Sequence, residues 1–219
     1  MAAVGHVIYL HGFASSPESS KAVRFGRELV RHNVSFACPD FNQPSFEDLT
    51  VTRMLGQTRD AVGAAQRGPV ALIGSSLGAF VAVHAAGQHR AVDRLVLLAP
   101  ALDLGDGPQG ANVDEWRRTG LLRIFHYAWN EHRDVKFALY EDAASYDSFA
   151  LDLQIPILVF QGTRDESVDP RMVERWARTR PNVDLRMVDD EHQLGKSMDA
   201  IWTACETFLG LSPGRPSIL

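Results

Sequence analysis

The sequence alternates short apolar runs with longer stretches in which apolar residues recur every three to four positions. Short apolar runs are typical of buried strands, and the longer spacing is typical of helices that bury one side. Strands that alternate with helices predict a mostly parallel sheet with helices on both faces. The expected fold class is therefore α/β, with about six strands in a single domain over residues 1–219.

Six apolar runs predict the strands, at residues 6–10, 34–38, 70–73, 92–99, 155–160 and 183–188. Helices are expected over about residues 17–32, 46–66, 79–88, 171–180 and 194–209. Ser16 and Pro17 are expected to begin the first helix, because serine caps helices and proline suits their first turn. The inward face of that helix is expected to hold Ala22, Val23, Phe25 and Leu29.

Residues 103–150 break this alternation. Apolar residues lie two apart on both sides of a polar stretch at 130–134: Phe125, Tyr127 and Trp129 before it, and Val135, Phe137 and Leu139 after it. This pattern predicts a β-hairpin, followed by a short helix over about residues 140–149. Because the segment lies between two strands of the sheet, it is expected to form a small lid above the carboxyl edge. The alternative is that this segment is an ordinary packed insertion without a gating role.

The composition is that of an ordinary globular protein, with 45% hydrophobic and 22% charged residues. Lys and Arg total 22 against 27 Asp and Glu, without a basic run, which argues against a nucleic-acid partner. No apolar run approaches the ~20 residues of a membrane span, and the first residues lack a signal-peptide pattern. Cys38 and Cys205 are expected to be reduced thiols, with a disulfide between them as the alternative. The protein is therefore expected to be cytoplasmic.

The strongest chemical motif is Gly74-x-Ser76-x-Gly78, which follows an apolar run and precedes a helix. So tight a turn leaves no room for a Cβ at the flanking positions, which explains the two glycines. The serine at the apex is expected to hold its hydroxyl above the sheet edge in a strained backbone conformation. The motif predicts that Ser76 is a nucleophile. A glycine-rich turn with a capping serine is the alternative, and Ser75 is expected to be structural.

A serine hydroxyl is a poor nucleophile at neutral pH and needs an imidazole to take its proton. Of the eight histidines, only His192 lies beyond the last expected strand, where a loop can carry it to Ser76. The order serine, acid, histidine along the chain is one that accompanies a serine in such a strand–turn–helix motif. His192 is therefore the expected general base. Four other histidines are expected to have packing or surface roles: His84, His89, His126 and His132.

The acid is expected in the loop after the fifth strand, which carries three carboxylates: Asp165, Glu166 and Asp169. Asp165 lies nearest the end of the strand and is preferred, with the task of fixing the imidazole tautomer. Asp169 precedes Pro170 and is the competitor, although it could instead cap the next helix. Asp103, after the fourth strand, is a weaker alternative.

An acyl-transfer site also needs two donors for the oxyanion. The backbone N–H of Leu77 is one, because it follows the nucleophile at the start of a helix. The second is expected from Phe13, since Gly12 allows the chain to bend after the first strand. His11 in this loop is expected to be a hydrogen-bonding scaffold residue.

Three segments, residues 11–22, 74–78 and 165–168, together with His192, resemble the YqiA/YcfP-type esterases, a small branch of the α/β-hydrolases. The chain from Ile155 onward is also similar to depalmitoylating acyl thioesterases of the same superfamily. The resemblance implies the α/β-hydrolase fold and a Ser76, Asp165, His192 triad, but it does not extend to residues 103–150. The sequence departs from the family pattern at Gln161, where a histidine is common, and at Asp169, where a proline is common.

The expected function is that of a serine hydrolase, a carboxylesterase or thioesterase that cleaves small to medium acyl esters through an acyl-enzyme on Ser76. Another reaction on the same triad (perhydrolysis, amide cleavage or carbon–carbon hydrolysis) is the alternative, and so is a non-catalytic binding protein that keeps the fold. No cofactor or metal is expected: the sequence lacks HExxH, no GxGxxG follows the first strand, and Gly195-Lys196-Ser197 lacks the remaining glycine of a phosphate loop.

Overall fold

The computed structural model describes residues 3–65, 68–104 and 112–211. Six parallel strands form its main sheet, in the spatial order β2 (Ser35–Ala37), β1 (His6–Leu10), β3 (Val70–Ser75), β4 (Val92–Leu98), β7 (Ile157–Gly162) and β8 (Val183–Val188). The expected α/β architecture with about six parallel strands is confirmed.

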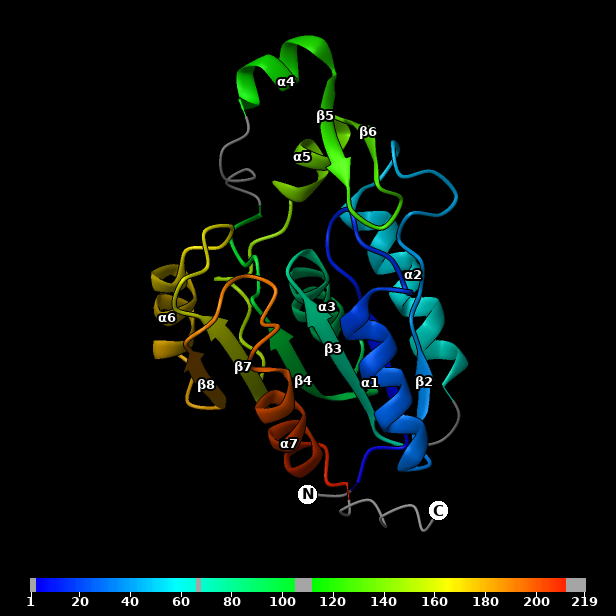
Figure 1. Cartoon of the computed structure of the whole chain (residues 1–219), viewed down its shortest axis with the longest axis vertical. Coiled ribbons are helices and arrows are strands. Elements are labelled where there is room, and N and C mark those ends of the chain that lie inside the picture. The colour runs from blue at the N-terminus through cyan, green and yellow to red at the C-terminus, as the bar shows by residue number, and fades with distance from the viewer. Residues whose placement is uncertain (1–2, 66–67, 105–111, 212–219) are drawn as a thin grey trace.

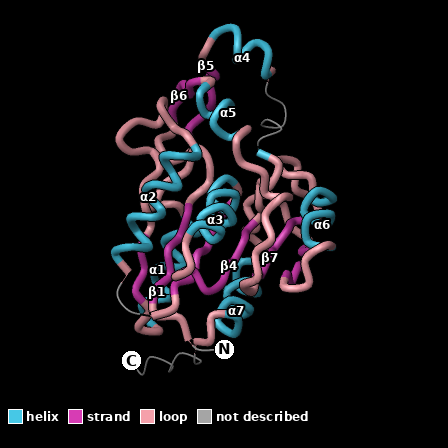
Figure 2. Tube along the Cα trace, turned by 180° about the vertical axis from the view of Figure 1, so that it is seen from behind, coloured by secondary structure: helices cyan, strands magenta, loops and turns pink. Residues whose placement is uncertain are grey.

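Helices cover both faces of this sheet (Figures 1 and 2). The face toward the viewer in Figure 1 carries α1 (Ser20–Arg31) and α7 (Met198–Phe208). The opposite face packs against α2 (Val51–Ala64), α3 (Leu77–Gln88) and α6 (Pro170–Arg178). Within the described ranges, none of the helices combines the length and the hydropathy that a membrane crossing requires.

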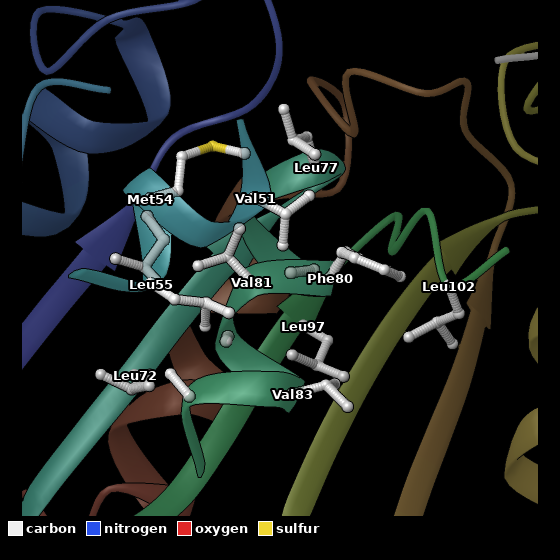
Figure 3. Packing of buried hydrophobic residues seen from close by; sticks show 14 of the residues in the cluster. Val51, Met54, Leu55, Leu72, Leu77, Phe80, Val81, Val83, Leu97 and Leu102 are labelled. Carbon is white, nitrogen blue, oxygen red and sulfur yellow. The ribbon is translucent and has the colours of Figure 1, made fainter. Parts of the chain in front are cut away.

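Successive residues of a strand point to opposite faces, so the sheet divides two hydrophobic cores. On β3, Leu72 packs with residues of α2 and α3, whereas Ala71 and Ile73 pack with residues of α1 and α7. Figure 3 shows the first of these cores, to which Met54 of α2, Phe80 of α3 and Leu72 all contribute. Every residue of β3 is buried. The strand is therefore a rigid support for the turn that follows it.

The first helix begins later than the sequence predicts. Ser19, not Ser16, is the N-cap of α1, and its side chain accepts a hydrogen bond from the Ala22 N–H. The Ser16 hydroxyl instead accepts from the Glu18 N–H within the preceding turn. The expected inward position of Val23 is also wrong, because this residue is 56% exposed while its neighbour Ala22 is buried. Consecutive helical residues lie about 100° apart, which turns Val23 away from the sheet.

Two further helices are shorter than predicted. The helix expected from residue 46 begins at Val51, because the Thr50 side chain caps it by accepting from the Arg53 N–H. The last helix begins at Met198 rather than near residue 194, and the intervening residues belong to the loop that carries His192. In both cases apolar residues before the helix are buried in turns, so apolar spacing alone overestimates helix length.

The predicted hairpin exists, but its strands lie about four residues earlier than expected. A separate layer lies beyond the carboxyl ends of the main strands (Figure 1) and consists of α4 (Val113–Thr119), β5 (Leu121–His126), β6 (Glu131–Lys136) and α5 (Ala138–Ala143). Asn130 adopts φ 54° in the turn between the two strands, a conformation that asparagine tolerates well. Part of the segment predicted as a lid, residues 105–111, lies outside the described residues.

Candidate active site

Ser76 lies in the turn between β3 and α3, with a backbone conformation that few residues adopt (φ 53°, ψ -116°). Its N–H donates to the Leu98 carbonyl oxygen at 2.9 Å, which fastens the turn to β4. The Ser76 side chain makes no capping hydrogen bond to α3 and lines a pocket. Ser76 therefore occupies the N-cap position of α3 without capping the helix through its side chain. Such strain is found where the surrounding structure holds a functional side chain in place.

The two flanking glycines are required by close backbone contacts. A Cβ built on Gly74 would lie 2.4 Å from the Cα atom of Ala79, and one built on Gly78 would lie 2.0 Å from the carbonyl oxygen of Leu10. Both neighbours are backbone atoms that cannot rotate away. The steric reason that the sequence gives for these glycines is confirmed.

Gly78→Ala is therefore expected to destabilise the fold by about 4 kcal/mol or more, or to prevent folding. Gly56→Ala in α2 is the matched control, because an added Cβ there meets nothing within 4 Å. Alanine is the better helix former, so this variant should gain about 0.5–1 kcal/mol in free energy of unfolding. Denaturant unfolding measures both changes. A Gly78→Ala protein as stable as the parent would contradict this turn geometry.

The amides expected to bind an oxyanion, those of Phe13 and Leu77, belong to residues that line the same pocket as Ser76. Gly12 brings the loop after β1 close to the nucleophile, since a Cβ built on it would lie 3.4 Å from the Ser76 Cβ. Leu77 is the first residue of α3, whose N-terminus favours negative charge. The arrangement can therefore present backbone donors beside Ser76.

His192 lies in the loop after β8 and lines the same pocket as Ser76. Its Nδ1 atom is 2.8 Å from Oδ2 of Asp165, which lies in the loop after β7. The buried side chain of Asp190 holds the histidine loop by accepting hydrogen bonds from the N–H groups of Glu191 and Ser197. The structure thus brings together an imidazole and a carboxylate that are far apart in the sequence.

Asp165 is held by four hydrogen bonds. Its Oδ1 atom accepts from the N–H groups of Ser167 and Val168, both at 2.9 Å. Its Oδ2 atom accepts from Gln161 Nε2 at 2.9 Å as well as facing His192. Burial alone would raise the pKa of this carboxyl, but the hydrogen bonds from His192, Val168 and Gln161 outweigh it and hold the pKa below its ordinary value. The group is therefore a carboxylate at neutral pH.

Gln161 is a site residue whose role the sequence does not reveal. The resemblance identifies it only as a departure from the family pattern, whereas the structure places its buried side chain against Asp165. Its Nε2 atom also donates to the Gly162 carbonyl oxygen at 3.2 Å. Its position four residues before the expected acid, at the end of a buried strand, is the only signal in the sequence. An amide donor fixes the carboxylate without adding a second titrating group.

The two alternative acids occupy other positions. Asp169 is the N-cap of α6, and its side chain accepts from the Arg171 N–H at 3.0 Å. The capping role that the sequence offered for this residue is therefore the one observed. Asp103 lines the pocket, but the imidazole of His192 bonds Asp165.

Three of the other histidines make contacts that fit a structural role. The buried ring of His84 contacts the Ser148 hydroxyl, and the buried ring of His126 contacts the Asn42 side chain. His11 Nε2 accepts a hydrogen bond from the Phe41 N–H at 3.0 Å. The expected packing and scaffold roles of these three residues agree with their contacts.

A cavity of about 650 Å³ is lined by Ser76 and His192 and by residues of the layer above the sheet. Residues of the β5–β6 hairpin and its flanking helices form an apolar part of its wall: Trp116, Leu122, Ile124, Phe125, Leu139 and Tyr140. A cavity of this size suits a small-molecule ligand. The arrangement can therefore place the acyl part of an ester against apolar side chains and its carbonyl near Ser76.

The model of the uncharacterised protein family UPF0227 matches residues 6–209. The chain belongs to this family. The match covers almost the whole chain, and the family is YqiA-like, which confirms the resemblance seen in the sequence. No curated protein matches this sequence.

Solved structures with the same fold include hydrolases and esterases. Est1E from Butyrivibrio proteoclasticus, with ferulic acid bound, is 20% identical (TM-score 0.80, covering 93% of this chain and 87% of that chain). Alpha/beta hydrolase domain-containing protein 10 from mouse is also 20% identical (TM-score 0.77, 93% and 88%). The esterase Pf2001 from Pyrococcus furiosus is 18% identical (TM-score 0.66, 95% and 82%). These similarities confirm the α/β-hydrolase fold.

Proposed function

We propose that this protein is a serine hydrolase that cleaves small to medium acyl esters or thioesters through an acyl-enzyme on Ser76. The observation that carries the proposal is the 2.8 Å contact between His192 Nδ1 and Asp165 Oδ2, beside a strained serine in the same pocket. A carboxylate on Nδ1 keeps the proton on that nitrogen and leaves Nε2 free to accept one.

In the proposed mechanism, Nε2 of His192 takes the hydroxyl proton of Ser76 while Oγ bonds to the substrate carbonyl carbon. The oxyanion accepts hydrogen bonds from the N–H groups of Phe13 and Leu77. The imidazolium then gives its proton to the leaving oxygen or sulfur, whose bond to carbon breaks. Water, deprotonated by the same histidine, attacks the acyl-enzyme, and Ser76 regains its proton as the acid departs.

The layer above the sheet is proposed to act as a lid within a single domain. The support is its place: its apolar residues face the pocket that Ser76 lines, and its chain lies between β4 and β7. The same residues limit the room for the acyl group, so short and medium acyl chains should fit better than long ones.

A series of 4-nitrophenyl esters from acetate to palmitate, with acyl-CoA thioesters of the same chain lengths, tests the proposed function. The expected result is hydrolysis with a maximum of kcat/KM at short or medium chains. Matched 4-nitroanilides and a perhydrolysis assay test two of the other reactions of this triad, amide cleavage and perhydrolysis. A protein that hydrolyses anilides but no ester or thioester would overturn the assignment.

A cytoplasmic location is part of the proposal. Cys38 and Cys205 are both free, and free cysteines are typical of proteins in reducing compartments. Fractionation of cells that express a tagged full-length chain tests this, and recovery in a membrane or secreted fraction would contradict it.

A further inference from the structure

The wall of the pocket differs chemically between its two sides. Residues of the layer above the sheet make one side apolar, as described above. The other side includes polar residues from the loop before α1, from the start of α1 and from the histidine loop: Ser15, Ser19, Lys21 and Gln193. A substrate that uses the whole pocket therefore has an apolar part and a polar part.

Lys21 is the cation of this polar side. It is the second residue of α1, and its half-buried side chain reaches the histidine loop. Its Nζ atom donates to the carbonyl oxygen of Gln193 at 3.2 Å, and the Gln193 side-chain oxygen lies 3.5 Å away. Among the described residues, no carboxylate oxygen lies within 4.0 Å of this ammonium group. The partners of Lys21 are therefore neutral.

A half-buried ammonium without a close counter-ion is electrostatically unfavourable. Burial lowers the pKa of Lys21 to about 8, although the more distant carboxylates of Asp165 and Asp190 act in the opposite direction. At neutral pH the group still carries its charge. An anion in the pocket would supply the missing counter-charge and at least one charge-assisted hydrogen bond.

The position of Lys21 indicates which part of the substrate would carry that anion. His192 protonates the leaving group in the proposed mechanism, so the leaving group must lie on the His192 side of the attacked carbonyl. Gln193 directly follows His192, and Lys21 is bonded to Gln193. The pocket carboxylates Asp103 and Glu166 follow other strands, β4 and β7, and would repel an anion placed beside them.

We propose that Lys21 forms an anion subsite, which selects esters or thioesters whose alcohol or thiol part carries a carboxylate or phosphate group. The inference rests on the proposed hydrolase function and adds the class of leaving group to it. The apolar acyl group would lie against the layer above the sheet, and the anionic group would lie between the start of α1 and the histidine loop.

Two chromogenic esters with the same acyl group test the subsite: 4-nitrophenyl butyrate and 3-carboxy-4-nitrophenyl butyrate. The measured quantity is the ratio of kcat/KM for the carboxylated ester to that for the neutral ester. Lys21→Met should lower this ratio by about tenfold or more, chiefly through the KM of the carboxylated ester. Lys21→Arg keeps the charge and should hold the ratio within about threefold of the parent. Exposed Lys196, outside the pocket, provides the control Lys196→Met, which should leave the ratio unchanged.

An equal loss of activity toward both esters in Lys21→Met would overturn the subsite, because Lys21 would then only position the histidine loop. An unchanged ratio would overturn it as well. Binding of 5-hydroxy-2-nitrobenzoate and 4-nitrophenol, measured by calorimetry, separates the subsite from the hydrolase function. If the parent cleaves neither ester, the proposed function fails, yet binding of the benzoate that weakens about tenfold in Lys21→Met would still support the subsite. Equal binding by parent and variant would refute it.

Discussion

Ser76→Ala is expected to lower kcat for ester hydrolysis by about a million-fold, the loss measured for the nucleophile of another serine hydrolase. The variant keeps the pocket and the oxyanion donors but cannot form the acyl-enzyme. Alanine tolerates the backbone conformation of this turn about as well as serine does, so stability should change little. Steady-state kinetics and thermal unfolding measure the two effects.

The same pair of measurements defines the outcome that would contradict this expectation. A folded Ser76→Ala protein that keeps most of its activity would mean that the strained turn positions something other than the nucleophile. If the activity is low and the midpoint of thermal unfolding is lowered as well, the kinetics must be repeated below the new midpoint. The folded variant must still be inactive there.

Asp165→Asn is expected to lower kcat by about ten thousand-fold, as the same change does in another triad. Two backbone N–H groups bond Oδ1 of Asp165, so they should hold the carbonyl oxygen of the new asparagine in that place. Its amide N–H groups would then face His192, whose Nδ1 atom would have to accept rather than donate. In that tautomer Nε2 already carries the proton, so this nitrogen cannot take the proton of Ser76.

Asp169→Asn is the matched control, because it makes the same change four residues away in the same loop. This residue caps α6 and does not contact His192. Asparagine caps helices about as well as aspartate, so both activity and stability should stay close to those of the parent. If Asp169→Asn lost the activity and Asp165→Asn kept it, the roles of the two carboxylates would be reversed.

The sequence predicts the parts of the fold whose physical cause is local. The strands β1 and β8 are recovered to the residue. The residues of β1 after His6 are all buried, whereas β8 is an edge strand whose exposed Asp184 and Arg186 alternate with half-buried apolar residues. Both patterns are local signals of a strand. The glycines around Ser76 are predicted for the same reason, since their requirement comes from a single tight turn. Short motifs also carry the resemblance to the family whose model matches residues 6–209.

Features that depend on distant contacts are predicted less well. The alternating apolar residues near Phe125 indicate a hairpin, but residues such as Tyr127 and Trp129 lie in its turn rather than on a strand. The contact of Gln161 with Asp165 depends on how the loop after β7 folds back over the sheet. Lys21 belongs to a motif that the sequence singles out, yet its approach to Gln193 joins residues 172 positions apart. No local pattern carries such information.

Covalent labelling of the nucleophile tests the central claim most directly. The full chain is treated with a fluorophosphonate probe, digested, and mapped by mass spectrometry. One adduct is expected, on Ser76. It should form much more slowly in His192→Gln. It should still form in Ser75→Ala, where only the neighbouring hydroxyl is removed. An unlabelled protein, or an adduct on any other serine, would contradict the central claim.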